Sequence, residues 1–323
     1  MTSFARHRRM RLSPELRKLR SETTLSASDL IMPIFVNESL EGSREISTMP
    51  GVFQFGYESA LEKIFEIESL NMGAIILFGI PSKKDDKASG AYADNGVIQN
   101  MTRKIKEKGM TIPVIADTCQ CEYTSNGHCG PLDEHECVDN DKTLEWLKKT
   151  AVSQAKAGAD IIAPSTMIDG MISSIREGLD KAGFKDTPIL SYGAKYASSF
   201  YGPFRDAAGS SGEFTGNRKN HQMDPCNREE ALMELKSDID EGADILMVKP
   251  AMTYLDIISD AKTLGYPVWA YNVSGEYALI KMGAQAGICD ETAMIEETLM
   301  SIRRAGADKI ITYFAEDYVK IMS

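Results

Sequence analysis

The sequence predicts an α/β fold, a (β/α)8 TIM barrel with an N-terminal extension arm, and two regularities indicate it. The first is a turn containing Gly-Ala-Asp that leads into an apolar run, at residues 157–160, 241–244 and 305–308, with a looser copy at 71–74. Glycine suits the left-handed residue that closes a helix, and an apolar run suits a strand buried on both faces. The second is helical patterning before these turns, as at 141–157. Strands that alternate with helices predict right-handed βα units and a parallel sheet.

Eight apolar runs are the candidate strands of this barrel. In chain order they occupy residues 30–36, 74–79, 112–118, 160–165, 187–193, 244–250, 266–272 and 309–314. Eight parallel strands with intervening helices make the (β/α)8 barrel, whose active site lies at the carboxyl ends of the strands. A doubly wound open sheet is the structural alternative, but the sequence carries no Gly-rich dinucleotide-binding fingerprint to favour it.

Two segments do not follow the repeat. Residues 1–28 contain few core-type side chains and form the predicted arm, which is either disordered or packed on a neighbouring subunit. Residues 29–323 form the predicted catalytic barrel. Within it, residues 200–227 are dense in Gly, Ser, Asn and charged residues, and they follow the fifth candidate strand. A long polar loop at that place is typical of an active-site lid.

Composition disfavours several classes of function. The chain has 323 residues, of which 43% are hydrophobic and 26% are charged, as in a globular protein with a large core. Its net charge of -11 and pI of about 5.0 disfavour nucleic acid as a partner, because an acidic protein repels phosphates. No run of 18 apolar residues is present, and the basic start lacks the apolar stretch of a signal peptide. We therefore expect a cytoplasmic protein with no membrane partner.

A cluster of cysteines follows the third candidate strand. Four of the six cysteines lie between residues 119 and 137, which favours metal binding or catalysis over a disulfide framework. Cys119, Cys121 and Cys129 would give a tetrahedral zinc ion three thiolates and leave one position open. An open position is the catalytic rather than the structural arrangement.

Two other interpretations of this cluster remain open. A structural Cys3His site would take its fourth ligand from His128 or His135. Alternatively, the segment is a loop that contains incidental cysteines. The remaining cysteines are expected to be ordinary buried or surface residues, and they are Cys137, Cys226 and Cys289.

Two lysines end adjacent candidate strands. Lys195 follows the fifth strand and Lys249 ends the sixth, after the apolar run Ile-Leu-Met-Val. At the mouth of a barrel, desolvation and a neighbouring cation lower the pKa of an amine and so produce the neutral form that attacks a ketone. The alternative for either lysine is an ordinary side chain that extends its charged end to the surface.

Polar residues of the predicted lid and of the last strands indicate an anionic substrate. The lid supplies Arg205, Arg218, Lys219 and Gln222. Arginine binds carboxylates in a bidentate way, so a basic lid fits an anion in an otherwise acidic protein. The last two strand ends add hydroxyl groups from Ser274 and Tyr313, which are placed to hold a second carboxylate. A solvated charged loop is the alternative interpretation of the lid.

Six segments resemble signatures of the porphobilinogen synthase (5-aminolevulinate dehydratase) family in its zinc-cysteine form. They are DTCQCEYTSNGHCG, APSTMIDG, SYGAKYASSFYGPFRDAAGS, GADILMVKPAMTYLDII, NVSGEYALIKMGAQAG and RRAGADKIITYFA, in family order and over nearly all of the chain beyond the arm. The lysine segment and the cysteine segment are highly specific together. The resemblance implies a lyase that condenses two molecules of 5-aminolevulinate to porphobilinogen with loss of two waters, in tetrapyrrole (heme) biosynthesis.

The resemblance also assigns roles to individual residues. Lys249 matches the lysine that forms a Schiff base with the first substrate, and Lys195 matches the lysine that engages the second. The matches to the ligands of a catalytic zinc are Cys119, Cys121 and Cys129. Further matches bind the substrate carboxylates or line the pocket, and they are Asp117, Ser165, Tyr201, Arg205, Arg218, Gln222, Ser274 and Tyr313.

The resemblance further implies an assembly and a second metal. Glu234 matches a position that supports an allosteric magnesium at a subunit contact in many bacterial members. Members are typically homo-octamers in which the arm embraces a partner subunit. This chain departs from the family pattern at Asn217, His221 and Cys226, which leaves the dynamics and pH response of the lid in doubt. His221 is a further candidate to reach the zinc.

Two competing functions remain to be separated. A class I Schiff-base aldolase on the same barrel would need one lysine and no zinc. A non-catalytic zinc-binding protein would explain the cysteines but would leave the two strand-end lysines and the basic lid without a role.

Overall fold

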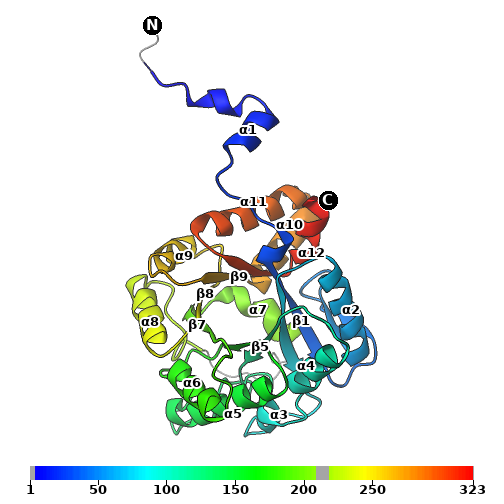
Figure 1. Ribbon diagram of the computed structural model, residues 1–323, viewed down its shortest axis with the longest axis vertical. Helices are drawn as coiled ribbons and strands as arrows, with labels where there is room; N and C mark the ends of the chain where they lie inside the picture. The colour runs from blue at the N-terminus through cyan, green and yellow to red at the C-terminus, as the bar shows by residue number, and fades with distance from the viewer. Residues whose placement is uncertain (1–3, 209–217, 323) are drawn as a thin grey trace.

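The computed structural model describes residues 4–208 and 218–322, and it confirms the predicted barrel (Figure 1). Within those residues eight parallel strands form the barrel wall: β1 (Leu30–Asn37), β4 (Ala74–Ile80), β5 (Val114–Thr118), β6 (Ile161–Pro164), β7 (Leu190–Lys195), β8 (Ile245–Lys249), β9 (Val268–Asn272) and β10 (Lys309–Thr312). Neighbouring strands pair in the order β6-β5-β4-β1-β10-β9-β8-β7. A parallel bridge between Ile162 and Ile189 joins the two ends of this order. The doubly wound open sheet is therefore excluded.

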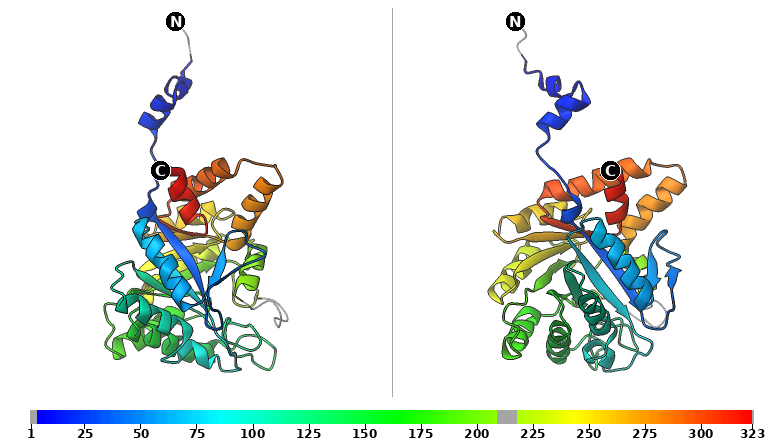
Figure 2. Two further views of the ribbon diagram at one scale, coloured as in Figure 1. Left: turned by 90° about the vertical axis from the view of Figure 1, so that its right-hand side faces the viewer. Right: turned by 45° about the vertical axis from the view of Figure 1, so that its right-hand side comes forward.

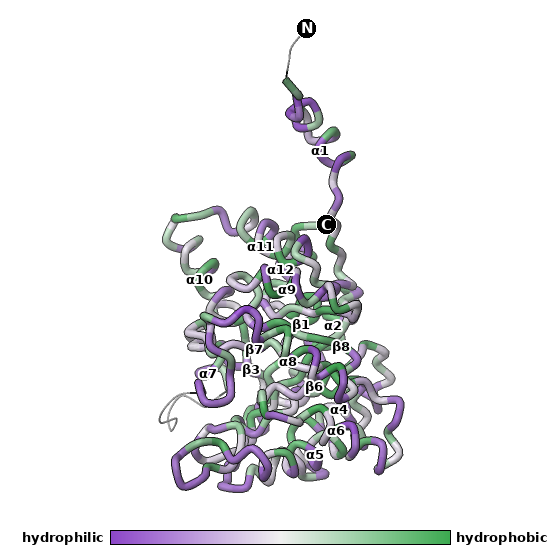
Figure 3. The backbone as a smooth tube through the Cα atoms, turned by 90° about the vertical axis from the view of Figure 1, so that its left-hand side faces the viewer, coloured by the Kyte–Doolittle hydropathy of each residue, from purple (hydrophilic) through white to green (hydrophobic). Residues whose placement is uncertain are grey.

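Helices cover the outside of the strands (Figure 1). They are α2 (Tyr57–Ser69), α3 (Ser89–Tyr92), α4 (Val97–Glu107), α5 (Asn140–Lys156), α6 (Met171–Lys181), α8 (Glu229–Asp240), α9 (Leu255–Lys262), α10 (Ser274–Gln285), α11 (Glu291–Ala305) and α12 (Ala315–Met322). Each of the long ones buries one apolar stripe. In α2, for example, Ala60, Leu61, Ile64 and Ile67 are buried at helical spacing. The strands of the barrel wall are almost entirely buried, and Figure 3 shows hydrophobic stretches of the chain around β1 and β8.

The repeated Gly-Ala-Asp turn has a structural cause. Its glycine takes a positive φ, +100° at Gly158 and +104° at Gly242, which only glycine adopts at no steric cost. Its aspartate accepts a hydrogen bond from the backbone at the start of the preceding strand. Val114 N donates to Asp160 at 2.7 Å, and the same bond is made to Asp244 and Asp308. Each copy of the turn therefore fixes two neighbouring strands.

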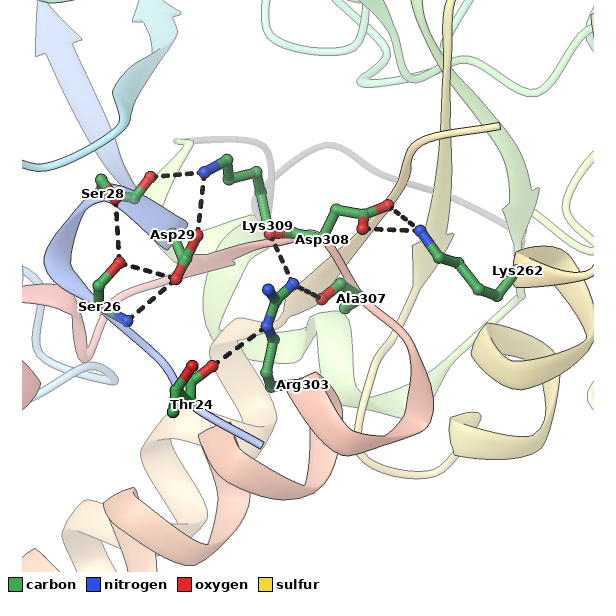
Figure 4. Close-up of polar contacts among 9 residues, drawn as sticks. All are labelled: Thr24, Ser26, Ser28, Asp29, Lys262, Arg303, Ala307, Asp308 and Lys309. Atoms are coloured by element: carbon green, nitrogen blue, oxygen red, sulfur yellow. Dashed lines mark hydrogen bonds and ion pairs between the residues drawn. The ribbon is translucent and has the colours of Figure 1, made fainter. Parts of the chain in front are cut away.

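The N-terminal arm extends away from the barrel (Figures 1 and 2). Its two short helices, η1 (His7–Arg11) and α1 (Pro14–Arg20), bury no residue. The arm is held where it joins the barrel, as Figure 4 shows: Arg303 donates to the carbonyl of Thr24, and Lys309 bonds to Ser28 and Asp29. The arm therefore makes its described contacts at its base.

A hairpin not predicted from the sequence lies at the carboxyl end of β1. It consists of β2 (Ser43–Glu45) and β3 (Phe53–Phe55), and β3 pairs with β1 through Phe35 and Gln54. The Gln54 side chain donates to the carbonyl of Ala207 at 2.6 Å, at the end of helix α7 (Gly202–Ala207). The hairpin thus supports the described half of the predicted lid. Among the described residues, no helix combines the length and the apolarity that crossing a membrane requires.

Candidate active site

Two lysines lie side by side at the carboxyl ends of β7 and β8. Lys195 and Lys249 are register partners in the sheet, and each is only 5% exposed. Both amines face one cavity at the mouth of the barrel. The structure thus brings together the two lysines singled out in the sequence, and both are buried rather than extended to the surface.

Aromatic rings surround the amine of Lys249. Its Nζ lies 4.1 Å from the centroid of the Tyr271 ring, 5.2 Å from Tyr192 and 5.4 Å from both Tyr201 and Phe204. Burial among these rings, and then the charge of Lys195, lower the pKa of Lys249 to about 7. A substantial fraction of this amine is therefore neutral and nucleophilic near neutral pH.

The second amine is held by the neighbouring strand end. Lys195 Nζ donates to the backbone carbonyl of Ser165, just after β6, and lies 5.8 Å from the centroid of the Tyr192 ring. Asp117, on β5, is buried, and burial followed by the charge of Glu122 raises its pKa well above the usual range. One of its carboxyl oxygens has no hydrogen-bond partner among the described residues.

Three thiols form a separate cluster beside this cavity. The Sγ atoms of Cys119, Cys121 and Cys129 all lie within 4.8 Å of one another, and the three residues are buried. Their mutual hydrogen bonds, first with Cys121 and then with Cys129, hold the pKa of the Cys119 thiol well below its usual value. Among the described residues this is the only group of three or more His, Cys, Asp or Glu ligand atoms close enough to hold one metal ion.

The structure limits the interpretations of the cysteine cluster. No imidazole nitrogen of His128 or His135 belongs to the described group of ligand atoms, which disfavours the Cys3His site. His221 is not in that group either, and its Nδ1 lies 2.6 Å from the side-chain oxygen of Asn220. Burial, followed by the charge of Lys195, lowers the pKa of His221 to about 3, so its ring is neutral. Asn217 lies outside the described residues, and Cys226 is exposed.

The described parts of the predicted lid, residues 200–208 and 218–227, contribute to the wall of the lysine cavity. Helix α7 lies over the barrel mouth and carries Phe204 and Arg205 (Figure 1). The hydroxyl of Tyr201 donates to the carbonyl of Lys249 at 3.2 Å. Arg218 donates to the carbonyl of Gly127, in the cysteine loop, at 3.0 Å. Residues of the predicted lid therefore contact both the amine site and the cysteine loop.

The side chains predicted to bind substrate carboxylates lie on two sides of the lysine cavity. Burial, followed by the charge of Arg218, lowers the pKa of Arg205, so the two guanidinium groups lie near each other. Gln222 is buried. On the other side, the Tyr313 hydroxyl lies 3.2 Å from that of Tyr271. The Ser274 hydroxyl accepts from the backbone of Phe204 at 3.0 Å, so the lid engages the very group expected to bind substrate.

The cavity between the lysines and the lid is small in this structure. Its volume is about 20 Å³, which is room for about one water molecule. Phe204 fills much of the remaining space, because its ring packs at 5.2 Å against Phe78 and at 5.7 Å against Phe35. Helix α7 therefore closes this cavity in the structure described.

Glu234 lies elsewhere, in a second and larger cavity. This cavity has a volume of about 580 Å³ and lies between α8, the start of α6 and residues 219–224 of the lid. Its carboxylates are those of Asp169, Asp224, Glu230, Glu234, Asp238 and Glu241. Burial, followed by the charge of Asp169, raises the pKa of Glu234. The cavity that contains the two lysines and the acidic cavity thus lie on opposite sides of strand β7.

The residues missed in the sequence are mostly aromatic. Tyr192, Phe204 and Tyr271 surround Lys249, and Glu122 lines the same cavity. The two tyrosines lie in strands β7 and β9, where their pattern is that of ordinary core residues. One feature of the sequence could have identified Tyr192 as a site residue. It lies three residues before Lys195, at a strand end already assigned to the barrel mouth.

These observations define the class of protein. A closed parallel barrel with two buried amines and a thiol cluster at the carboxyl ends of its strands is a barrel enzyme with its active site at that face. The sequence profile of the family described as Delta-aminolevulinic acid dehydratase matches residues 4–321. The chain belongs to this family, and it is therefore a dehydratase, an enzyme of the lyase class. The family resemblance inferred from the sequence is confirmed.

Individual relatives agree over almost the whole chain. The Delta-aminolevulinic acid dehydratase of Staphylococcus epidermidis is 53% identical over 99% of this chain and 99% of its own length. That of Halalkalibacterium halodurans is 53% identical over 98% of this chain and 97% of its own. The crystal structure of the Toxoplasma gondii enzyme, in complex with its reaction product porphobilinogen, has a TM-score of 0.95 and 41% identity over 98% of this chain and 91% of that one.

Proposed function

We propose that this chain is a porphobilinogen synthase that condenses two molecules of 5-aminolevulinate to porphobilinogen, with loss of two waters, in the cytoplasm. The observation that carries the proposal is the buried pair Lys195 and Lys249, of which Lys249 has a pKa of about 7. One neutral amine can bind one ketone substrate covalently, while the second amine lies beside it for the other. A class I aldolase would need only one of them.

Lys249 is the proposed nucleophile of the first step. Its nitrogen attacks the ketone carbon of the first 5-aminolevulinate, and the carbonyl oxygen leaves as water when the imine forms. The surrounding rings exclude bulk water from this centre. Asp117, whose pKa is raised by burial and by the nearby charge of Glu122, is the proposed donor of a proton to the departing oxygen. Ser274 and Tyr313 would hold the carboxylate of this substrate once α7 releases the serine hydroxyl.

Lys195 is the proposed partner of the second substrate. Its contact with the Ser165 carbonyl fixes the amine at the edge of the cavity that faces the cysteine cluster. Arg205 and Arg218 would bind the carboxylate of this substrate from the lid, with Gln222 beside them. The two substrates would then enter from different sides and meet between the two lysines.

The cysteine cluster fits zinc. Three buried thiols within bonding distance of one ion provide the soft ligands that zinc prefers over magnesium or calcium. Cys119, Cys121 and Cys129 would hold it beside the lysine cavity, which Cys121 lines. When bound there, zinc would supply a Lewis acid at the site of the second substrate.

The simplest test of the activity uses the product. The protein is incubated with 5-aminolevulinate, and the pyrrole is measured with Ehrlich's reagent. We expect colour to form in proportion to enzyme and time. A class I aldolase would form the imine but no pyrrole, and a non-catalytic zinc protein would form neither.

The lid arginines give a prediction about substrate use. Arg205→Lys and Arg218→Lys keep the charge but lose the bidentate fork, so each should raise KM about tenfold, the loss expected for one charged hydrogen bond. The melting temperature should change little. Arg228→Lys is the matched control, because Arg228 is exposed and pairs with Asp260 outside the cavity. Unchanged kinetics in either lid variant would show that this arginine does not bind the substrate.

We also propose that Glu234 supports an allosteric magnesium ion in a homo-octamer. Its cavity is lined by carboxylates, the hard oxygen ligands that magnesium prefers. The arm would pack on a partner subunit, because its large apolar side chains are exposed here, including Leu12 at 65% and Leu19 at 77%. Burial of such side chains in an assembly would stabilise it.

The magnesium proposal predicts a selective loss. Glu234→Gln should remove the stimulation of activity by added magnesium, while the activity supported by zinc remains. Glu229→Gln, an exposed residue at the start of the same helix, is the control. The measurement is turnover against magnesium concentration at fixed zinc. Equal stimulation of Glu234→Gln and wild type would reject this assignment.

A further inference from the structure

Strand β7 contains one extra residue just before Lys195. Ser191 pairs with Leu246 of β8, whereas Ala194 pairs with Val248, so three steps along β7 correspond to two steps along β8. In a regular strand, residues four apart point to the same face. Because of the extra residue, Ser191 and Lys195 point to opposite faces: Ser191 faces helix α8, whereas Lys195 faces the cavity. Without it, the residue opposite Lys249 would not be Lys195.

Asp238 of α8 contacts this irregular segment from outside the barrel. Its carboxylate accepts a hydrogen bond from the Ser191 hydroxyl. The same carboxylate packs on Gly193, because a Cβ added there would lie 2.3 Å from Asp238 Oδ2. One side chain thus touches Ser191 and Gly193, two residues of the irregular segment, and Gly193 is needed for the close approach.

The burial of Asp238 is unusual for a carboxylate. The residue is 7% exposed and has no ion-pair partner among those found in the described residues. Burying a carboxyl group costs free energy unless hydrogen bonds compensate. The pKa of Asp238 is raised to about 7, first by burial and then by the charges of Glu241 and Glu234, against the lowering effect of the Ser191 hydrogen bond. Burial of this carboxyl group costs free energy, and the group lies next to the irregular segment of β7 that orients Lys195. We therefore infer that Asp238 has a role beyond packing.

We propose that Asp238 is a positioning residue for Lys195, which it orients by holding Ser191 and Gly193 in the irregular part of β7. Asp238 itself does not contact the lysine cavity. The inference rests on the proposed role of Lys195 in the condensation. It also connects the acidic cavity to the active site, because Asp238 lines that cavity and accepts a hydrogen bond from Ser191 of β7.

The test compares variants at position 238. Asp238→Ala removes the acceptor and should lower kcat about tenfold or more, as expected when a buried hydrogen-bond network is broken. Asp238→Asn keeps the size and one acceptor oxygen, so it should retain most of the activity. Asp240→Ala, an exposed aspartate on the same helix, should equal wild type.

Trapping of the first substrate separates positioning from general damage. Borohydride reduction in the presence of 5-aminolevulinate should label Lys249 in Asp238→Ala as completely as in wild type, because β8 is not displaced. Turnover per labelled site should nevertheless fall. If labelling and turnover fall together, the effect is on folding and the proposal is wrong.

Ser191→Ala provides a second variant if Asp238→Ala does not fold. It removes the donor of the same hydrogen bond and should lower turnover while Lys249 labelling stays complete. Wild-type turnover in Ser191→Ala would overturn the proposal. The wild-type assay separates this result from failure of the proposed function: a wild type that makes no pyrrole refutes the condensation itself, whatever the variants do.

Discussion

Lys249→Ala is expected to lose essentially all turnover while the barrel stays folded. Loss of a catalytic nucleophile costs on the order of a thousandfold or more in kcat. Lys195 is not expected to substitute, because its proposed role is to engage the second substrate. In wild type, borohydride reduction with 5-aminolevulinate should add mass to the peptide that contains MVKPA, and in Lys249→Ala this addition should be absent.

Two variants control this experiment. Lys195→Ala should still be labelled at Lys249 but should form no porphobilinogen, which would separate the two lysines by function. Lys236→Ala, at an exposed position on α8, should behave as wild type. Circular dichroism and the melting temperature establish that each variant is folded. Wild-type turnover in Lys249→Ala would end the assignment of this residue as the nucleophile.

The pH dependence of imine formation provides an independent check. Burial, followed by the charge of Lys195, lowers the pKa of Lys249 from an ordinary value near 10.5 to about 7. Only the neutral amine attacks, so the single-turnover rate of imine formation should rise with pH through about 7 and level off above it. An amine with the ordinary value would instead show a rate that keeps rising to pH 10.

The barrel itself was predictable because its strands are buried on both faces. Such strands appear as unbroken apolar runs, and the Gly-Ala-Asp turns mark where three of them begin. The strand-end lysines followed from the same pattern, because a charged residue after an apolar run ends the strand at the barrel mouth. The cysteine spacing likewise predicted three donors that the structure brings within 4.8 Å.

Other features leave no signal in a single sequence. Strand β2 is fully exposed and only three residues long, so the hairpin has no hydrophobic period to detect. Helix α7 has six residues and begins with Gly-Pro inside a polar segment, which is the pattern of a loop. The extra residue of β7 is invisible because register depends on pairing with β8 and on the contact from Asp238, neither of which is local. Tertiary contacts decide these features.

Removal of the metal should abolish activity without unfolding the barrel. Zinc is the expected ion, because three thiolates select it over magnesium. The three cysteines form a cluster of their own, separate from the main hydrophobic core that joins the strands and helices. Loss of the ion should therefore leave the far-ultraviolet circular dichroism spectrum unchanged. Added zinc should restore activity, and magnesium alone should not.

Variants test whether the cysteines are responsible. Cys129→Ser should bind zinc more weakly and lose most of its activity, with partial recovery at high zinc. Cys137→Ser is the matched control, because Cys137 belongs to the same segment but lies outside the thiol cluster. Its zinc content and turnover should equal those of wild type. Lead, which also prefers sulfur ligands, should inhibit by competing with zinc, and Cys129→Ser should weaken this inhibition.

The decisive condition is low zinc in the presence of magnesium. The enzyme is stripped to below about one tenth of an equivalent of zinc, a level at which few thiol sites hold an ion. Folding is checked, and turnover is then measured with magnesium alone. Activity should fall in proportion to the zinc lost, because each active site needs its own ion. Full turnover under these conditions would show that Cys119, Cys121 and Cys129 are not a catalytic metal site, even though their thiols lie together beside the lysine cavity.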